Sequence, residues 1–313
     1  MRLRAPVPDD APAVLAVLVA RGVADLGAPD DTLEDVLDEW RASDLDLAAD
    51  ARVVEAEDGE IVGYAVVRRP GTLAVVHPDH EGQGIGTRLL EWAERREPER
   101  GLERHRQWVA AGNARARTLL TAAGYAVARS HWRLGRSLDD VGAGAPPPTG
   151  VGLRTVDAGR DAISMHTLDA RSFAGHPGYT AESLREFSEE HLEAHAFDGS
   201  LSRIAEEGGD IVGFLLARRR VEEAVGYVDL LAVDPDHQGR GVGTALLASA
   251  FAAFASAGLR GARLGVDSDN PRALRVYERA GMKVLFRYDG YERPMAPAWV
   301  GLEPRTVGVR PAG

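Results

Sequence analysis

The sequence predicts an α/β protein of mixed α+β type, with two tandem domains that each hold a mixed, mostly antiparallel sheet flanked by helices. Three observations lead to this prediction. The chain has 313 residues, enough for two domains of average size. A long block of sequence occurs twice. Within each copy, short apolar runs typical of strands alternate with longer runs that have helical spacing.

The duplicated block is centred on a glycine-rich loop. Val76-His-Pro-Asp-His-Glu-Gly-Gln-Gly-Ile-Gly-Thr87 matches Val233-Asp-Pro-Asp-His-Gln-Gly-Arg-Gly-Val-Gly-Thr244, and eight of the twelve positions are identical. The two blocks lie about half the chain apart, so the repeated unit is a whole domain and not a short solenoid unit. We therefore predict an N-terminal domain, a Gly/Pro linker, a C-terminal domain and a tail, over residues 1–137, 138–151, 152–294 and 295–313.

The second copy shows the elements before the loop most clearly. A short apolar run predicts a first strand at Leu153–Val156. Helical spacing predicts helices at Asp161–Arg171 and Thr180–His195, the latter with Thr180 as its N-cap. Two strand-like runs, Ser202–Glu206 and Ile211–Arg218, are separated by a Gly-Gly turn, which indicates a hairpin.

After the hairpin, the pattern predicts the elements that carry the chemistry. Tyr227–Val233 is an apolar strand that stops at Asp-Pro, and the glycine-rich loop leads into a helix at Ala245–Ala257. A strand at Arg263–Val266 follows. Asn270-Pro271 is typical of an N-cap and first helical position, and this helix should end at a glycine. The closing strands of this copy are predicted at residues 284–287 and 291–293.

Composition excludes several classes of function. The formal net charge is −11, which argues against a general binder of nucleic acid or anionic membranes and favours a cationic or amine substrate. The absence of cysteine excludes disulfides, thiolate nucleophiles and cysteine-ligated metals. We expect a cytoplasmic protein. No metal site is predicted, because the spacing of four histidines lacks a convincing third ligand, and we interpret them as structural: His166, His176, His191, His195.

The loop between strand and helix is a potential anion site. Backbone N–H groups at a helix start point outward, and the helix dipole favours negative charge there. No Lys-Ser/Thr pair follows, so it is not a Walker loop, and it follows the fourth strand, which excludes a dinucleotide fingerprint. A Gly-x-Gly alone is weak evidence for a ligand.

Two motifs together are more specific. Gln238-x-x-Gly241-x-Gly243 resembles the acetyl-coenzyme-A signature of the GNAT N-acetyltransferase superfamily, and Asn270 with Tyr277 and Gly281 resembles its second signature. The resemblance covers essentially the whole of each copy. Two such domains in one chain are similar to mycothiol synthase and related actinobacterial tandem acetyltransferases.

The resemblance implies acetyl-CoA as cosubstrate and assigns roles to residues of the second copy. The loop would bind the pyrophosphate, the preceding strand would pair with the pantetheine arm, and Asn270 would contact the arm further along. Tyr277 would protonate the leaving thiolate. The implied cofactor-binding residues are Leu231, Ala232, Val233, Gln238, Gly239, Arg240, Gly241, Val242, Gly243, Thr244, Asn270.

The implied reaction needs a base, because an ammonium group has no free lone pair. Asp229, on the strand leading into the loop, is the candidate; the alternatives are an acid on the solvent-facing side of the strand or a salt-bridge partner. Mycothiol synthase carries its acid two residues earlier, where this chain has Tyr227. Without cysteine, direct transfer in a ternary complex is the simpler hypothesis, with a strand N–H such as that of Leu231 facing the oxyanion.

The first copy keeps the scaffold but not the proposed catalytic side chains. Thr72 stands where the second copy has Asp229, Leu120 where it has Tyr277, and Glu81 replaces Gln238. A carboxylate at that point would repel a pyrophosphate. We predict a catalytic second half and a degenerate first half that offers a possible second cofactor site, at Val76, Gln83, Gly84, Ile85, Gly86, Thr87.

Three functions remain open at this point. The first is N-acetylation of a small-molecule primary amine. The second is a non-catalytic acyl-CoA-binding or sensor module, and the third is a mycothiol-synthase-like or protein N-acetyltransferase. Pairing of the two halves as a pseudo-dimer predicts a monomer, with a homodimer as the alternative.

Overall fold

The computed structural model describes residues 1–29, 31–68, 71–142, 146–176, 179, 181–221, 223–268 and 270–295. Within these ranges the strands form one continuous twelve-stranded sheet, in the order β1-β2-β3-β4-β5-β12-β6-β11-β10-β9-β8-β7. The strands of the first sequence copy are β1 Arg2–Arg4, β2 Ala51–Glu55, β3 Ile61–Arg68, β4 Gly71–Val76, β5 Arg104–Ala110 and β6 Ala126–Ser137. Those of the second are β7 Val151–Thr155, β8 Arg203–Glu207, β9 Asp210–Arg220, β10 Val225–Val233, β11 Gly261–Asp267 and β12 Lys283–Pro294.

Helices cover both faces of this sheet. The first copy contributes α1 Ala11–Leu26, α2 Leu33–Arg41, α3 Leu47–Asp50, α4 Ile85–Glu99 and α5 Ala114–Ala122. The second contributes α6 Ala158–Phe173, α7 Leu184–Phe187, α8 Val242–Ser256 and α9 Pro271–Arg279. We call β1–β5 with their helices the N-terminal half and β7–β11 with theirs the C-terminal half. In the C-terminal half, α6 packs on one face and α8 on the other, each over its own apolar cluster.

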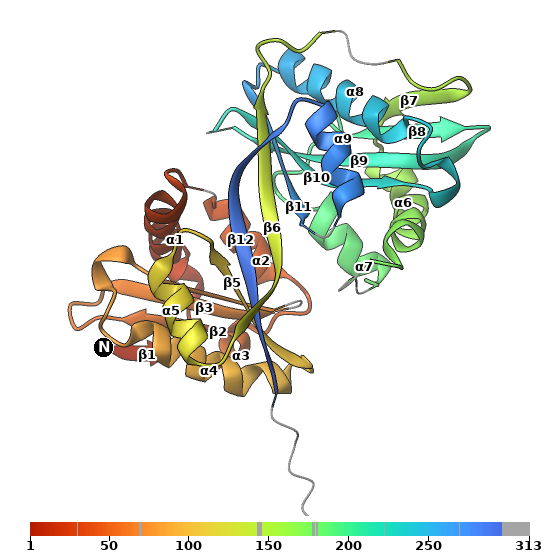
Figure 1. Ribbon diagram of the computed structural model, residues 1–313. Coiled ribbons are helices and arrows are strands. Elements are labelled where there is room, and N and C mark those ends of the chain that lie inside the picture. The colour runs from red at the N-terminus through yellow and green to blue at the C-terminus, as the bar shows by residue number, and fades with distance from the viewer. Residues whose placement is uncertain are drawn as a thin grey trace, which may run out of the picture.

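The two sequence copies exchange their last strands. β12, from the second copy, pairs with β5 of the N-terminal half, and β6, from the first copy, pairs with β11 of the C-terminal half. The two long strands also pair with each other and run together between the halves (Figure 1). Leu134 of β6 is thereby fully buried in the core of the C-terminal half.

The expectation that two short strands would close the sheet of their own copy is therefore wrong. Residues 283–294 form one strand, and its partners are β5 and β6. The edge of β11 needs an antiparallel partner for its backbone groups, and β6 satisfies them as well as β12 would. The predicted boundaries at residues 137 and 152 separate the two sequence copies. They do not separate the two halves, because β6 and β12 each pair with the half formed mainly by the other copy.

This exchange predicts that the two copies stay together when the chain is cut between them. A protease site inserted at residues 143–145 separates β6 from β7 covalently, but β6 keeps its pairs with β11 and β12. We expect both fragments to elute as one species in gel filtration without denaturant. Elution of two separate folded fragments would contradict the exchange. The uncut inserted chain is the control.

Most other predicted elements are confirmed with small changes of boundary, and one is not. In place of a helix over 180–195, α7 begins after Ser183, whose hydroxyl accepts a hydrogen bond from the N–H of Glu186. A single π-helical turn, η3, follows at Ser188–Leu192. The predicted N-cap Thr180 lies outside the described residues, as do linker residues 143–145 and tail residues 296–313. Among the described helices, none is both long and apolar enough to cross a bilayer.

Candidate active site

The glycine-rich loop of the C-terminal half has the backbone of an anion site. Gly239 and Gly241 have φ values of +78° and +94°, a region that L side chains adopt only with strain. Helix α8 begins directly after them, at Val242. The N–H groups of Val242, Gly243 and Thr244 therefore belong to the first helical turn, where no intrahelical carbonyl accepts them. These donors are available to a phosphate.

Side chains of the same loop hold it in place. The Gln238 amide donates to the Val233 carbonyl at 3.1 Å and accepts from Arg272 at 2.6 Å. Arg240 makes a two-point ion pair with Glu207 at the end of β8, at 2.6 and 3.0 Å. This pair lowers the pKa of Glu207 to about 2. The side chains of Gln238 and Arg240, which the sequence analysis assigned to the cofactor, therefore also hold the loop in place.

Strands β10 and β11 part at a fork beside the loop. Their parallel pairing ends at Val228 and Leu264, and no pair joins their described residues beyond it. At the same place the register between β10 and β9 shifts, which leaves Asp229 in a β-bulge. Bulges redirect side chains and are common next to active sites. Leu231, Ala232 and Val233 lie on the free stretch of β10, although the Val233 carbonyl already accepts from Gln238 and from Ser172 at 3.2 Å.

Asp229 occupies the bulge as a paired carboxylate. One oxygen lies 2.7 Å from Nδ1 of His191 in η3, and the other lies 2.9 Å from Nε of Arg218 in β9. The side chain is 13% exposed. Burial alone would raise its pKa, but the hydrogen bond from His191 and the charge of Arg218 outweigh burial and lower it. The oxygen that contacts His191 also accepts from Nη2 of Arg218 at 3.2 Å, the other oxygen lies against the charge of the same guanidinium, and the group is ionised.

Tyr277 lies on α9 in the apolar cluster under α8, with 8% of its surface exposed. Burial, with a smaller contribution from Tyr227, raises its pKa to about 12, so the phenol keeps its proton at neutral pH. Asn270 caps α9, its side-chain oxygen accepting from the N–H of Ala273 at 3.0 Å, as predicted.

Tyr227, two residues before the bulge, is held by cations. The guanidinium groups of Arg133 and Arg220 lie over its ring at 5.1 and 5.3 Å from the centroid. Arg133 also donates a hydrogen bond to the Tyr227 hydroxyl. Because Arg133 belongs to β6, the strand exchange brings a residue of the first copy to the fork of the second. No pattern in the sequence signalled this contact.

The N-terminal half repeats the loop without the bulge. Gly82 and Gly84 have φ values of +74° and +78°, and α4 begins at Ile85. Strand β4 pairs with β3 in unbroken register. Thr72, at the position of Asp229, is fully buried and donates to Glu97 at 2.6 Å. This half therefore carries the glycine-rich loop but has a buried hydroxyl where the other half has an ionised carboxylate.

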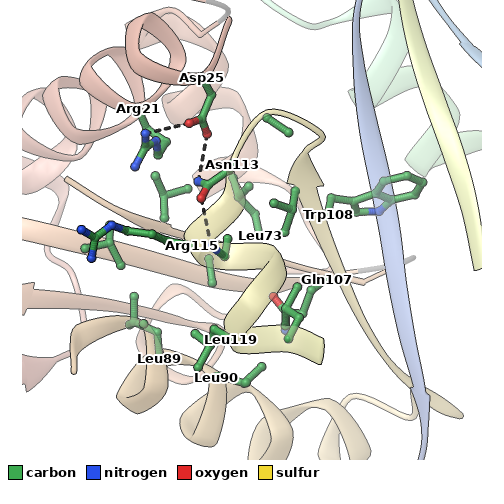
Figure 2. Close-up of a pocket in the computed structure, with 18 of the residues that line it drawn as sticks. Arg21, Asp25, Leu73, Leu89, Leu90, Gln107, Trp108, Asn113, Arg115 and Leu119 are labelled. Atoms are coloured by element: carbon green, nitrogen blue, oxygen red, sulfur yellow. Dashed lines mark hydrogen bonds and ion pairs between the residues drawn. The ribbon is translucent and has the colours of Figure 1, made fainter. Parts of the chain in front are cut away.

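A cavity of about 980 Å³ lies in the N-terminal half, between β4, β5, α4 and α5. Figure 2 shows a polar group at one end of it: Arg21, Asp25, Asn113. Leucines of α4 and α5 line the other end: Leu89, Leu90, Leu119. Its wall includes Gln107, which is 3% exposed and whose Nε2 has no hydrogen-bond partner among the described residues. The predicted second-site residues Val76, Gly84, Ile85, Gly86 and Thr87 line the cavity as well.

Glu81 does not present an isolated negative charge to this cavity. Its carboxylate lies 2.6 Å from Arg21 and 3.0 Å from Arg115. Arg21 lies in α1 and also pairs with Asp25 at 2.7 Å. Two guanidinium groups therefore compensate the carboxylate that sequence reasoning expected to repel a pyrophosphate.

Acidic helix α2 of the N-terminal half contacts the C-terminal half. Asp35 pairs with Arg220 at 3.2 Å, and a carboxylate oxygen of Asp38 accepts from the backbone N–H of His195 at 2.9 Å. The polar face of this helix thus borders the segment that carries His191. Sequence reasoning treated His191 as structural, because only the fold brings η3 against the bulge.

Comparison with known proteins agrees with this geometry. The model of the acetyltransferase (GNAT) family matches residues 24–125 and 163–282. Mycothiol acetyltransferase of Streptomyces coelicolor is 34% identical over 236 residues, which cover 72% of this chain and 74% of that protein. The namesake from Beutenbergia cavernae is also 34% identical, over 79% of this chain and 85% of that protein.

Solved structures show the same architecture. A GCN5-related N-acetyltransferase from Sphaerobacter thermophilus superposes with a TM-score of 0.78 at 30% identity, over 95% of this chain and 96% of that one. A tandem GNAT protein from the clavulanic acid biosynthesis pathway gives 0.72 at 16% identity, over 95% and 100%. Two matches of one family model, relatives above 30% identity and the fold together show that this chain is a tandem N-acetyltransferase of the GNAT family.

Proposed function

We propose that the C-terminal half transfers an acetyl group from acetyl-CoA to the primary amine of a small molecule, by direct attack in a ternary complex. The observation that carries the proposal is a difference between the halves: the C-terminal half has two ionisable side chains at positions where the N-terminal half has none. In the C-terminal half Asp229 lies in the bulge, and Tyr277 belongs to the apolar cluster that includes Val228 of the same strand. The matching positions of the N-terminal half hold Thr72 and Leu120.

Acetyl-CoA fits the C-terminal fork in three parts. The first-turn N–H groups of α8 bind the pyrophosphate, and the unpaired edge of β10 at Leu231 and Ala232 accepts the pantetheine arm as an added strand does. The thioester then lies at the fork, where the Leu231 N–H is placed to stabilise the oxyanion. The carboxylate of Asp229 favours removal of a proton from the incoming ammonium, and the phenol of Tyr277 protonates the thiolate.

Replacing Tyr277 by Phe tests the role of the phenol. We expect kcat to fall by roughly 100-fold, the usual contribution of a general acid, while the affinity for acetyl-CoA stays within a factor of about two. Isothermal titration provides the affinity, and steady-state release of free thiol provides kcat. The backbone carbonyl of Tyr277 accepts from the N–H of Met282 at 3.0 Å, which Phe retains, and the phenol hydroxyl makes no side-chain hydrogen bond to another described residue, so the substitution removes no internal contact of that kind. An unchanged kcat would exclude Tyr277 as the acid.

The acceptor is proposed to be a cationic amine. The net charge of −11 favours such a substrate, and so do the carboxylates around the fork. The curated relatives favour an amine acceptor of the mycothiol type as a second, narrower candidate. Tyr227 stands where an acid is expected for that substrate, and it is covered by two arginines, which favours a different amine.

We further propose that the N-terminal half binds CoA without turnover. Its cavity and left-handed glycines support this, as does the compensated Glu81. Gln107 adds a specific point, because a buried amide N–H without a partner costs about 1–3 kcal/mol until an acceptor reaches it. A carbonyl oxygen of the pantetheine arm or of the thioester is an acceptor of suitable size for that position.

An activity screen tests the proposed function directly. Purified protein is incubated with acetyl-CoA and a panel of small amines, peptides with free N-termini and lysine peptides, and thiol release is followed. Turnover with small amines alone supports the proposal. Turnover with peptides alone favours a protein acetyltransferase, and binding of acetyl-CoA without any turnover favours a sensor module.

A further inference from the structure

We propose that Nε2 of His191 is the atom that removes the proton from the acceptor amine, and that Asp229 acts through His191 as a positioning residue. This inference rests on the proposed function and assigns the base of that reaction. Its starting point is geometric: one oxygen of the carboxylate in the bulge lies 2.7 Å from Nδ1 of His191 and accepts from Nη2 of Arg218 at 3.2 Å, and the other oxygen lies 2.9 Å from Nε of Arg218.

The contact between the two side chains fixes which ring nitrogen is free. An ionised carboxylate only accepts hydrogen bonds, so Nδ1 of His191 carries the hydrogen that lies between it and Asp229. In the neutral ring Nε2 then has the lone pair, and it makes no hydrogen bond to a described residue. This is the general arrangement of a base oriented by a third group.

The fold places the imidazole of His191 between the bulge and the edge of the core. His191 lies on η3, a single π-helical turn, and its side chain is 13% exposed, in ring contact with buried Phe187 at 5.0 Å. Such turns are rare and occur frequently at functional sites. The imidazole is therefore packed against Phe187 and retains a small exposed part.

Carboxylates around His191 favour a cationic acceptor. Glu182 and Glu190 each bring an oxygen within 4.8 Å of a ring nitrogen of His191 and of one another. Burial and the charge of Glu190 raise the pKa of Glu182 to about 7. An ammonium group entering this cluster replaces the missing counter-charge and comes to lie beside the imidazole. The two glutamates bind and orient the amine, while the histidine takes the proton.

The step balances with the reactants already named. One proton passes from the ammonium group to Nε2, and the freed lone pair forms the bond to the thioester carbonyl carbon. Collapse of the tetrahedral intermediate breaks the carbon–sulfur bond and releases the thiolate. The nitrogen loses a second proton to solvent, and the thiolate takes one from Tyr277. The products are the amide and free CoA.

The charges that face His191 determine the direction of the pH dependence. They come from η3 and the segment before α7, from α6, and from β9 and β10: Glu190, Glu182, Asp169, His166, Arg218, Asp229. Burial lowers the pKa of His191, but the hydrogen bond and charge of Asp229, with the two glutamates, raise it above 6.5 overall. Since only the neutral ring accepts a proton, kcat/KM should increase as pH rises through the raised pKa of His191.

The decisive variant is His191→Asn, because the Asn amide retains a donor toward Asp229 and removes the accepting nitrogen. We expect kcat/KM to fall by roughly 100-fold or more and the rising limb of the pH profile to disappear, with acetyl-CoA affinity unchanged. His195→Asn, four residues further at an exposed position, is the matched control and should keep both rate and limb. Glu182→Gln should raise KM for the amine several-fold and keep the limb.

A measurement on the unaltered protein covers the case in which His191→Asn does not fold. Ionisation of imidazole has a large enthalpy and that of a carboxyl group a small one, so the limb should move to lower pH on warming. A limb that does not move with temperature assigns the base to a carboxylate and overturns the inference. If His191→Asn turns over at the wild-type rate with an unchanged rising limb, the inference about His191 is overturned and the proposed function is left intact. No turnover by the wild type overturns both.

Discussion

Replacing Asp229 by Asn should reduce both catalysis and stability, and it is the single substitution for which we expect the largest loss. We expect kcat to fall by about 100-fold or more, because the imidazole of His191 loses the group that orients it. We expect the free energy of unfolding to fall by about 3 kcal/mol, because Arg218, 16% exposed, is left without its ion-pair partner. Steady-state kinetics and urea unfolding at pH 7 measure the two effects.

The pH dependence of the stability loss has a definite sign. The folded-state pKa of Asp229 is lowered, so its ionised form stabilises the fold above the ordinary carboxyl pKa. That stabilisation is lost as pH falls through the folded-state value. The difference in unfolding free energy between wild type and Asp229→Asn should therefore shrink in acid.

Asp161 provides the matched control for Asp229. It is 2% exposed in α6 and pairs with Arg154 and Arg160 at 2.6 and 2.9 Å, remote from the bulge. Asp161→Asn should lower stability and leave kcat of the folded protein unchanged. If Asp229→Asn behaved in the same way, Asp229 would be only a structural ion pair.

The second large effect concerns the two glycine-rich loops. We expect the wild type to bind two equivalents of acetyl-CoA, and Gly241→Glu and Gly84→Glu to bind one each. A carboxylate at the start of α8 or α4 opposes the phosphate that the first-turn N–H groups attract. Activity should be lost in Gly241→Glu alone. Isothermal titration gives the stoichiometry and thiol release gives the activity.

These two glycines are a well-matched pair. Both have a left-handed backbone, with φ of +94° and +78°, so the two substitutions carry a similar strain. A Cβ at Gly241 would meet Pro148 at 3.9 Å, and one at Gly84 would meet nothing within 4 Å. A wild type that binds one equivalent, lost in Gly241→Glu, would show that the N-terminal half is a structural partner. Activity lost in Gly84→Glu alone would reverse the assignment of the halves.

Local patterns predicted most elements of the fold correctly. Left-handed glycines mark both loops, and Asn270 caps the helix that the sequence places after it. These features depend on a few adjacent residues, whose conformational preferences act over one helical turn. The helix predicted over 180–195 is shorter in the structure, where α7 and the π-helical turn η3 together span 184–192, because the N-cap at Ser183 starts the element later than predicted.

The candidate site was only partly predictable. The sequence predicts Asp229 and Tyr277 as site residues, which stays a prediction, and it gives no sign of the partners that the structure shows for Asp229. His191 lies 38 residues before Asp229 in the chain, and Arg218 lies on the neighbouring strand. The bulge that redirects the carboxylate depends on the register between two strands. Neither the composition of the chain nor the spacing of its residues predicts that register.

By itself, the sequence determined the duplication, the two glycine-rich loops and the difference between the copies at Asp229 and Tyr277, because each depends on residue identity at fixed spacing. Only the tertiary structure decided which strand closes which half, since the edges of β5 and β11 accept either copy's last strand. It also decided that Glu81 is compensated by Arg21 and Arg115. Charges distant in sequence compensate one another only once packing has brought them within a few ångströms.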